Sequence, residues 1–183
     1  MAKEIETKFR VEAPAEFRAK LAGVGASFLS RKLERDIYYA GPAGADVTSI
    51  RLRTTDKKGL FTIKSRPDTR ADTSPGIKVL EELQVEVADA DAFGRMLDMM
   101  GYVPQLRKDK IRETYDWNGI LICLDELPCL GFFLEIEAPE DGIRAAASAL
   151  GLDMTQAIGE TYMQLFSRYK TVRGLPDLEL VFP

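Results

Sequence analysis

The amino-acid sequence predicts an α+β fold, an eight-stranded antiparallel β-barrel with helices packed on the outside. Three observations support this prediction. Nearly every predicted strand alternates charged and apolar residues, which gives it one charged and one apolar face. Short turns join most neighbouring strands, and strands joined in this way are antiparallel. About four helical segments interrupt about eight strands, and eight strands are enough to close a barrel.

Composition indicates one globular domain without a nucleic-acid or membrane partner. The chain has 183 residues, of which 45% are hydrophobic, enough for a sizeable core. We expect a single domain over residues 1–170 and a C-terminal tail over residues 171–183. The net charge is only −4 although 30% of residues are charged, so no overall excess attracts nucleic acid or an anionic membrane. No apolar run approaches the roughly 20 residues that span a bilayer, and the charged N-terminus is not signal-like, so we expect a cytoplasmic protein.

The absence of histidine narrows the chemistry. With no histidine and only two cysteines, a zinc site built from imidazole and thiolate ligands is nearly excluded. Nucleophilic catalysis by a Ser-His or Cys-His pair is excluded as well. An enzyme with this sequence has to use carboxylates, lysine, tyrosine or a metal-bound water.

The N-terminal half is predicted to begin with a strand and a helix. Residues 4–11 alternate strictly between charged and uncharged side chains, which is typical of a strand. Pro14 begins a helix to about Val24, whose apolar residues recur at three- and four-residue spacing. A strand over residues 35–40 ends at a cluster of glycine and proline. Residues 49–54 and 60–64 both alternate and are joined by a turn at 56–59, so they are predicted to form a hairpin.

The C-terminal half is predicted to complete the barrel. Residues 66–76 lack periodicity and form a long loop, which ends at an alternating strand over residues 79–87. Asp89 or Asp91 caps a helix to about Met100, with an apolar stripe that faces the core. The turn at Asn118-Gly119 is a strong hairpin signal between two further strands. The remaining predicted elements are strands at 105–117, 120–125 and 132–138, and helices at 141–150 and 160–168.

The charged strand faces are predicted to line the barrel interior. Taken alone, a charged strand face more often meets bulk water than forms a site. The apolar stripes at residues 17–24 and 93–100 are, however, suited to cover the apolar strand faces from outside, which would turn the charged faces inward. The cations on these faces are Lys8, Arg51, Arg53, Lys64, Lys108, Lys110 and Arg112. The carboxylates are Glu4, Glu6, Glu82, Glu86, Asp125, Glu135 and Glu137.

An interior of this kind requires a charged ligand. Unpaired buried charge is very costly, so these groups have to pair, stay hydrated or meet a ligand of compensating charge. Arginine and lysine neutralise phosphoryl oxygens, whereas Asp and Glu oxygens hold Mg²⁺ or Mn²⁺. A triphosphate with a divalent metal fits both sets of residues, so we expect a metal-dependent enzyme that binds such a small molecule.

The N-terminal motif Glu4-x-Glu6-x-Lys8 resembles the ExExK signature of the CYTH, or triphosphate tunnel metalloenzyme, superfamily. The resemblance continues in order over nearly the whole chain, through Asp36-Ile37-Tyr38-Tyr39, Ile50-Arg51-Leu52-Arg53, Phe61-Thr62-Ile63-Lys64, Glu82-Leu83-Gln84-Val85-Glu86-Val87, Lys110-Ile111-Arg112-Glu113, Leu124-Asp125, residues 131–137 and residues 161–165. It implies an eight-stranded tunnel that binds a nucleoside or inorganic triphosphate with Mg²⁺ or Mn²⁺.

The resemblance also implies roles for individual residues. The expected metal ligands are Glu4, Glu6, Glu82, Asp125, Glu135 and Glu137. The expected triphosphate-binding residues are Lys8, Arg51, Arg53, Lys64, Lys110 and Arg112, with Lys108 a weaker addition. Glu4, Glu6 and Lys8 are the expected catalytic residues. One departure is that Leu80 and Gln84 stand where the family often has an Arg ahead of a Glu-x-Glu pair, which leaves one ligand's identity open.

The leading functional hypothesis is an adenylyl cyclase. The length and element order resemble class IV adenylyl cyclases, in which the 3′-hydroxyl of ATP attacks the α-phosphorus and pyrophosphate leaves. A triphosphatase acting on inorganic, nucleoside or thiamine triphosphate is the alternative, because the same residues serve both reactions. A non-catalytic nucleotide or polyphosphate-binding protein is the third hypothesis, and a homodimer is compatible with each. Outside the site, Asp36 is expected to orient an arginine, Trp117 to pack beside a turn, and Tyr162 to anchor the last helix.

Overall fold

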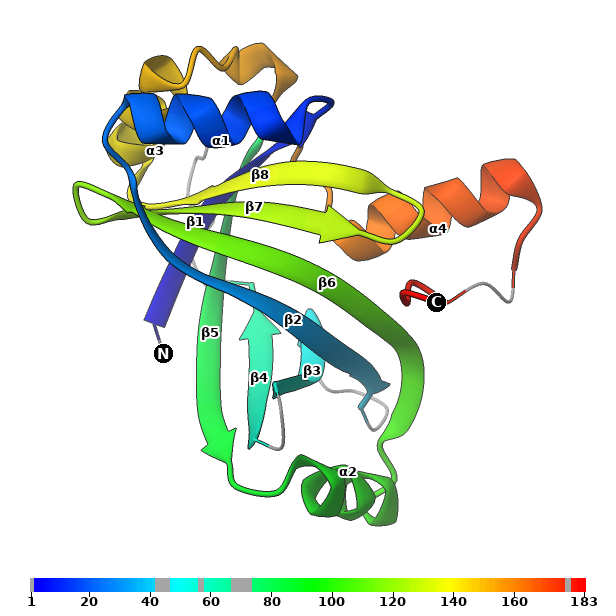
Figure 1. Cartoon of the computed structure of the whole chain (residues 1–183). Helices are drawn as coiled ribbons and strands as arrows, with labels where there is room; N and C mark the ends of the chain where they lie inside the picture. Colours follow the sequence, from blue (N-terminus) through cyan, green and yellow to red (C-terminus); the bar gives the residue numbers. More distant parts are fainter. Residues whose placement is uncertain (1, 42–46, 56–57, 67–73, 177–178) are drawn as a thin grey trace.

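The computed structural model describes residues 2–41, 47–55, 58–66, 74–176 and 179–183. Its strands form a closed barrel in the order β1-β5-β4-β3-β2-β6-β7-β8 (Figure 1). The strands are β1 (Ala2–Val11), β2 (Ser27–Ala40), β3 (Ser49–Thr55), β4 (Lys58–Ser65), β5 (Ile77–Val87), β6 (Val103–Trp117), β7 (Ile120–Leu127) and β8 (Gly131–Glu137). Every neighbouring pair is antiparallel, and β1 closes the barrel by pairing with both β5 and β8. The predicted α+β fold class is confirmed.

The helices lie outside the strands or at the ends of the barrel. They are α1 (Pro14–Gly23), α2 (Ala90–Met99), α3 (Glu140–Ala149), α4 (Tyr162–Arg173) and the short 3₁₀ helix η1 (Met154–Gln156). Figure 1 shows α1 and α3 together over β7 and β8, and α2 at the opposite end of the molecule. None of the helices in the described part of the chain is long and apolar enough to span a bilayer.

The largest apolar cluster lies between the outer barrel face and helices α1 and α3. Phe9, Ile122 and Leu134 belong to β1, β7 and β8, and each is at most 2% exposed. Leu21 of α1 and Ile143 of α3 belong to the same cluster and are fully buried. Because alternate residues of a strand point to opposite faces, this outer apolar layer turns the neighbouring charged residues inward. The predicted orientation of the charged faces is therefore confirmed on this side of the barrel.

The covering is incomplete around α2 and β5. Leu97 of α2 is buried, but Met96 and Met100, which were also expected in the core, are 55% and 59% exposed. Leu83 and Val85 on the outer face of β5 are 57% and 54% exposed. The prediction for the two methionines is wrong because α2 packs on β3, β4 and β6 through a narrow face that includes Phe93 and Leu97 but neither methionine.

Two element boundaries differ from the sequence prediction by five residues or more. Strand β2 begins at Ser27 and not near residue 35, because it pairs along almost the whole of β6, from Ser27 opposite Asp116 to Ala40 opposite Val103. A register shift after Phe28 interrupts the side-chain alternation by which strands are predicted. Helix α4 continues to Arg173 and ends at Gly174, whose φ of 66° is left-handed. Parts of the predicted turn at 56–59 and of the loop at 66–76 lie outside the described residues.

The predicted hairpin between β6 and β7 is confirmed. Asn118 and Gly119 have φ values of 53° and 80°, and Trp117 pairs directly with Ile120. Asn-Gly favours this geometry because both residues tolerate positive φ in a two-residue turn. The turn sets the register of β7 on β6, which places Asp125 opposite Arg112 inside the barrel.

Candidate active site

The inward residues enclose a cavity of about 540 Å³, which is within the usual size of small-molecule sites. Among the residues that the structure describes, its wall carries eight lysine and arginine side chains and five glutamates. The cations are Lys8, Arg51, Arg53, Lys64, Lys78, Lys108, Lys110 and Arg112, and the glutamates are Glu4, Glu6, Glu82, Glu135 and Glu137. The wall is thus locally cationic in a chain whose net charge is −4.

Antiparallel register brings charged residues of neighbouring strands face to face. Glu6 on β1 lies opposite Lys78 on β5 and opposite Glu137 on β8, because β1 pairs with both strands. Lys8 lies opposite Glu135, and the two form an ion pair at 2.9 Å. Because Glu4, Glu6 and Lys8 are spaced two residues apart, all three side chains of the signature motif point to the same inner wall.

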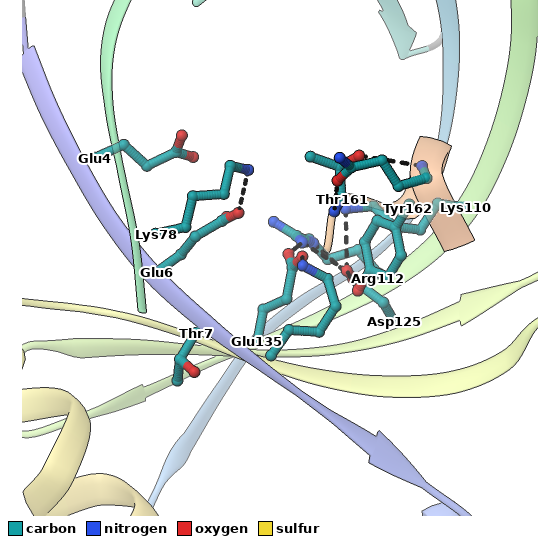
Figure 2. A network of polar contacts seen from close by, with 12 residues as sticks. Glu4, Glu6, Thr7, Lys78, Lys110, Arg112, Asp125, Glu135, Thr161 and Tyr162 are labelled. Carbon is teal, nitrogen blue, oxygen red and sulfur yellow. Dashed lines mark hydrogen bonds and ion pairs between the residues drawn. The ribbon is translucent and has the colours of Figure 1, made fainter. Parts of the chain in front are cut away.

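Four glutamates form an acidic group on one side of the cavity, namely Glu4, Glu6, Glu82 and Glu137. Figure 2 shows Glu4 and Glu6 of this group. Lys64 Nζ lies 2.5 Å from Glu4 and 3.8 Å from Glu82, and Lys78 Nζ lies 2.7 Å from Glu6. Burial and then repulsion by Glu6 raise the pKa of Glu4, despite the neighbouring Lys64. Burial works to raise the pKa of Glu6 as well, but there Lys8 and Lys78 outweigh it and the pKa is lowered.

Glu137 is the least compensated carboxylate of this acidic group. In the described part of the chain no lysine or arginine forms an ion pair with it, whereas Glu4 and Glu6 each have one. Burial and then the negative charge of Glu4 raise the pKa of Glu137, with smaller contributions from Glu6 and Glu82. Mutual repulsion of this kind is relieved when a cation binds among the carboxylates.

The acidic group fits a divalent cation by its donor chemistry, although it is not a preassembled cage. Carboxylate oxygens are the ligands that Mg²⁺ and Mn²⁺ prefer. Within the described ranges, however, no three Asp, Glu, Cys or His side chains are close enough together to hold a metal ion. The ammonium groups of Lys64 and Lys78 are bound to these glutamates instead. A metal ion would have to displace them, and the freed lysines would then be available to an anion.

The opposite side of the cavity is built around Asp125 (Figure 2). This carboxylate is fully buried and accepts hydrogen bonds from Arg112 at 2.6 and 2.7 Å and from Lys110 at 3.1 Å. The hydroxyl of Tyr162 donates to it at 2.9 Å. Arg112 also contacts Glu135. Burial and the adjacent Arg112 lower the pKa of Lys110, so a bound phosphate would stabilise its charged form.

A second buried carboxylate, Asp36, holds two further cations. Arg53 donates to it through two nitrogens at 2.7 and 3.0 Å, and Lys108 Nζ lies 3.0 Å away. Burial opposes ionisation, but Lys108 and Arg53 hold the pKa of Asp36 well below its usual range. Arg53 also pairs with Glu34 at 2.8 Å. The expectation that Asp36 orients an arginine is confirmed.

Arg51 differs from these cations because it has spare donors. Its Nη2 donates to Thr62 Oγ1 at 3.0 Å. Its Nε is buried without a hydrogen-bond partner, and no carboxylate in the described ranges pairs with it. A buried guanidinium with an unused donor costs free energy unless a ligand completes it. Arg51 therefore has the chemistry of an anion-binding residue.

The structure brings together eleven of the twelve residues expected in the site, since all except Asp125 line the cavity. Asp125 lies behind the wall and is engaged by Arg112, Lys110 and Tyr162, so we assign it to holding those groups. Glu86, on the same strand face as Glu82, is exposed and does not line the cavity.

Sequence reasoning missed Lys78, Tyr38 and the cavity-facing position of Tyr162. For Lys78 there was a usable signal, because it lies four residues before Glu82 and hence on the same strand face. Tyr162 had no such signal, because a helical residue next to a barrel shows no alternation. It does anchor the last helix as expected, through ring contact with Phe133 at 5.2 Å.

Comparison with known proteins agrees with this geometry. The CYTH domain family model matches residues 2–157. A protein of Methanocaldococcus jannaschii, named as a proposed adenylate cyclase, is 29% identical over 137 residues, which are 73% of this chain and 75% of that protein. A Pyrococcus horikoshii protein of known structure is 28% identical, with a TM-score of 0.73 over 88% of this chain and 98% of its own.

A more distant structure shares the fold alone. A Hippeastrum protein, described as a proposed adenylyl cyclase with a dominant triphosphatase activity, is 19% identical. Its TM-score is 0.64, and the match covers 90% of this chain and 95% of that one. The family match extends over most of the chain and ends beyond the last strand, and the barrel encloses the charged cavity that the signature motif predicts. The chain belongs to the CYTH domain family.

Proposed function

We propose that this protein is a metal-dependent enzyme that acts on a triphosphate, with cyclisation of ATP to cyclic AMP and pyrophosphate as its leading reaction. The observation that carries the proposal is the cavity wall, in which cations outnumber glutamates although the whole chain is acidic. A triphosphate carries several negative charges along a short chain, and its oxygens accept charge-assisted hydrogen bonds from lysine and arginine. An anionic oxygen would give the buried Nε of Arg51 the acceptor that it lacks among the described residues, and would compensate the charge of the guanidinium as well.

In this proposal the residues divide into two sets. Lys8, Lys110 and Arg112 bind and orient the phosphate chain from one side of the cavity, and Arg51 adds a donor from β3. Glu4, Glu6, Glu82 and Glu137 would hold a Mg²⁺ or Mn²⁺ ion, which when bound neutralises charge that develops on the phosphate oxygens. Positioning and charge neutralisation supply most of the barrier lowering in phosphoryl transfer. No histidine is needed for either contribution.

Two observations support the cyclase assignment, the name of a relative and the uncharged part of the cavity wall. The Methanocaldococcus jannaschii relative is named as a proposed adenylate cyclase. Uncharged side chains suited to a nucleoside, including Tyr38, Ile50 and Met163, form part of the wall beside the cations. In the cyclase reaction the 3′-oxygen of ATP would form a bond to the α-phosphorus while the bond to pyrophosphate breaks.

A triphosphatase is the second candidate. Its supporting observation is the predominance of charged residues in the wall, because an inorganic triphosphate needs no base-binding surface. The Hippeastrum protein, whose fold is shared, is described as having a dominant triphosphatase activity. Both reactions would use the same cations, so product identity has to separate them.

The test is a product analysis with purified protein. ATP, inorganic triphosphate and thiamine triphosphate are each incubated with Mg²⁺ or Mn²⁺, and the products are separated by chromatography. Cyclic AMP and pyrophosphate from ATP support the cyclase. ADP and phosphate from ATP, with faster turnover of inorganic triphosphate, contradict it in favour of the triphosphatase. Tight binding without any product rejects both reactions and indicates a binding protein.

A matched pair of variants tests the site itself. Glu6→Ala removes a carboxylate of the acidic group, and we expect it to lower metal-dependent turnover by at least about 100-fold. Glu81→Ala, on a strand that also contributes to the wall but at a position that does not line the cavity, is the control and should retain turnover. Equal activity in the two variants would show that the metal binds elsewhere.

A further inference from the structure

The first turn of α4 forms part of the cavity wall. Thr161, Tyr162 and Met163 line the cavity, and the rest of the helix packs through Leu165 and Phe166 in an apolar cluster with Phe133. The start of the helix is fixed by a capping box, in which Thr161 Oγ1 accepts from Gln164 N and the Gln164 side chain accepts from Thr161 N. Tyr162 is therefore presented to the cavity by a rigid element that is separate from the barrel strands.

The ring of Tyr162 contacts three ammonium groups. The Nζ atoms of Lys8, Lys108 and Lys110 lie 4.5, 5.5 and 5.7 Å from its centroid. The three lysines are only 3%, 2% and 3% exposed, and they come from two strands, β1 and β6. An aromatic face attracts ammonium groups within about 6 Å, most strongly where water is excluded. Each of the three ammonium groups also has a carboxylate partner at 2.9 to 3.1 Å, and the ring is a contact that all three share.

The hydroxyl of Tyr162 acts on the carboxylate behind these lysines. It donates to Asp125 Oδ2, the atom that also accepts from Lys110 and Arg112. Burial and the neighbouring Asp125 raise the pKa of Tyr162 well above its usual value, so the hydroxyl keeps its proton and remains a donor. The contact fixes Asp125, and through it the two cations that face the cavity.

We propose that Tyr162 is a positioning residue for triphosphate binding, whose ring holds the ammonium groups of Lys8, Lys108 and Lys110 at one end of the cavity while its hydroxyl fixes Asp125. The proposal rests on the proposed function, because the anion is the ligand for which the lysines are positioned. It gives the last helix a part in binding as well as in packing. It also gives Lys108 a place beside Lys8 and Lys110.

The experiment compares three variants. Tyr162→Leu removes the ring and the hydroxyl, and Tyr162→Phe removes the hydroxyl alone. Tyr169→Leu is the matched control, because Tyr169 lies on the same helix, stacks on Phe166 and does not line the cavity. Binding of inorganic triphosphate is measured by calorimetry at several salt concentrations. We expect Kd to rise about tenfold or more in Tyr162→Leu, whereas Tyr162→Phe should stay within about threefold of wild type and Tyr169→Leu should match it.

A measurement on the wild-type protein makes the proposal independent of how well the variants fold. Protons above an aromatic ring are shifted upfield in the NMR spectrum, so the ε-methylene signals of Lys8, Lys108 and Lys110 should be shifted in the wild type. These signals should return toward ordinary values most in Tyr162→Leu, which lacks the ring, and least in Tyr162→Phe, which keeps it. Ordinary signals for all three lysines in the wild type overturn the proposal. If wild type binds triphosphate and Tyr162→Leu binds it equally well, the role of Tyr162 falls and the proposed function stands. If wild type does not bind triphosphate, both fall.

Discussion

At the scale of single residues, Arg51 and Arg53 are two positions apart on β3 but have different surroundings. Arg53 forms ion pairs with both Asp36 and Glu34, and Lys108 forms one with Asp36. These four side chains make a buried network in which the protein itself compensates the charge of Arg53. Among the residues that the structure describes, Arg51 donates to one threonine and its buried Nε has no hydrogen-bond partner. Two identical side chains on one strand face thus differ in how far the protein itself satisfies their hydrogen-bond donors.

This difference predicts that the same substitution affects ligand binding at one position and stability at the other. Arg51→Gln should raise the Kd for triphosphate about 10- to 100-fold, which corresponds to the loss of a charge-assisted hydrogen bond of about 1.5–3 kcal/mol. It should change the free energy of unfolding little, because no carboxylate in the described part of the chain loses its partner. Arg53→Gln should lower the free energy of unfolding by about 3 kcal/mol, because it breaks a buried ion pair. Calorimetric binding and urea unfolding of both variants check this, and the reverse ranking would contradict it.

Glu137 predicts how metal binding depends on pH. Burial and the charge of Glu4 raise its pKa, so this carboxyl group retains its proton to a higher pH than an ordinary glutamate. A metal ion needs the deprotonated form, and proton and metal therefore compete. Affinity for Mn²⁺ should fall as the pH is lowered toward the range in which glutamate takes up a proton, and the fall should begin at a higher pH than for an ordinary glutamate because the pKa of Glu137 is raised. Glu137→Gln should show a weaker affinity with a smaller pH dependence. Titrations monitored by calorimetry measure both, and a pH-independent affinity of the wild type in this range would contradict the assignment.

At the scale of elements, the segment before β5 depends on a glycine. Gly76 has a φ of 83°, and its carbonyl accepts a hydrogen bond from Thr7 Oγ1 at 2.9 Å, which ties it to β1. A Cβ atom at this position would lie 2.4 Å from Cβ of Ala157. Ile158 N in turn donates to Lys8 O at 2.8 Å. The segment around η1 is thereby packed against the outside of the strand that carries the signature motif.

We expect Gly76→Ala to lower the free energy of unfolding by about 1–3 kcal/mol, from backbone strain combined with the clash. Gly151→Ala is the control, because Gly151 also has a positive φ of 67° but an added Cβ would meet nothing within 4 Å. The control isolates the backbone cost, which is about 1 kcal/mol for a residue forced into the left-handed region. Equal loss in the two variants, measured by urea unfolding, would show that the contact with Ala157 can relax.

At the scale of the whole molecule, an acidic protein encloses a cationic cavity. The net charge is −4, yet cations outnumber glutamates among the residues that line the cavity. Three buried carboxylates, Glu34, Asp36 and Asp125, lie behind the wall and compensate several of the cations. The arrangement lets many lysine and arginine side chains stay buried beside the cavity before a ligand arrives.

Triphosphate binding should therefore depend on salt and should stabilise the fold. Salt screens the attraction between the anion and the cavity, so Kd should rise steadily with sodium chloride concentration. Triphosphate at about 100 times its Kd should add roughly 2.7 kcal/mol to the free energy of unfolding, visible as a higher Tm. Thermal unfolding with and without triphosphate at low and high salt measures both effects. A Tm that triphosphate does not change would contradict binding to the folded protein.

The sequence by itself determined the elements and the direction in which their faces point. Alternation in residues 4–11, 49–54 and 60–64 is a local property of the chain, and it predicted both the barrel and the inward placement of Glu6, Arg53 and their neighbours. The Asn118-Gly119 turn was equally local, since its backbone geometry depends on two residues. The order of the motifs along the chain indicated the family.

Only the tertiary structure decided which charges are compensated and which remain available to a ligand. Whether Arg51 or Arg53 has a carboxylate partner depends on side chains of strands far away in the sequence, and these meet only when the barrel closes. The contacts of Tyr162 likewise depend on where α4 packs, because this packing brings its hydroxyl to Asp125 and its ring to three lysines. The physical reason is that side-chain direction follows from the local backbone, whereas charge pairing depends on distances across the folded chain.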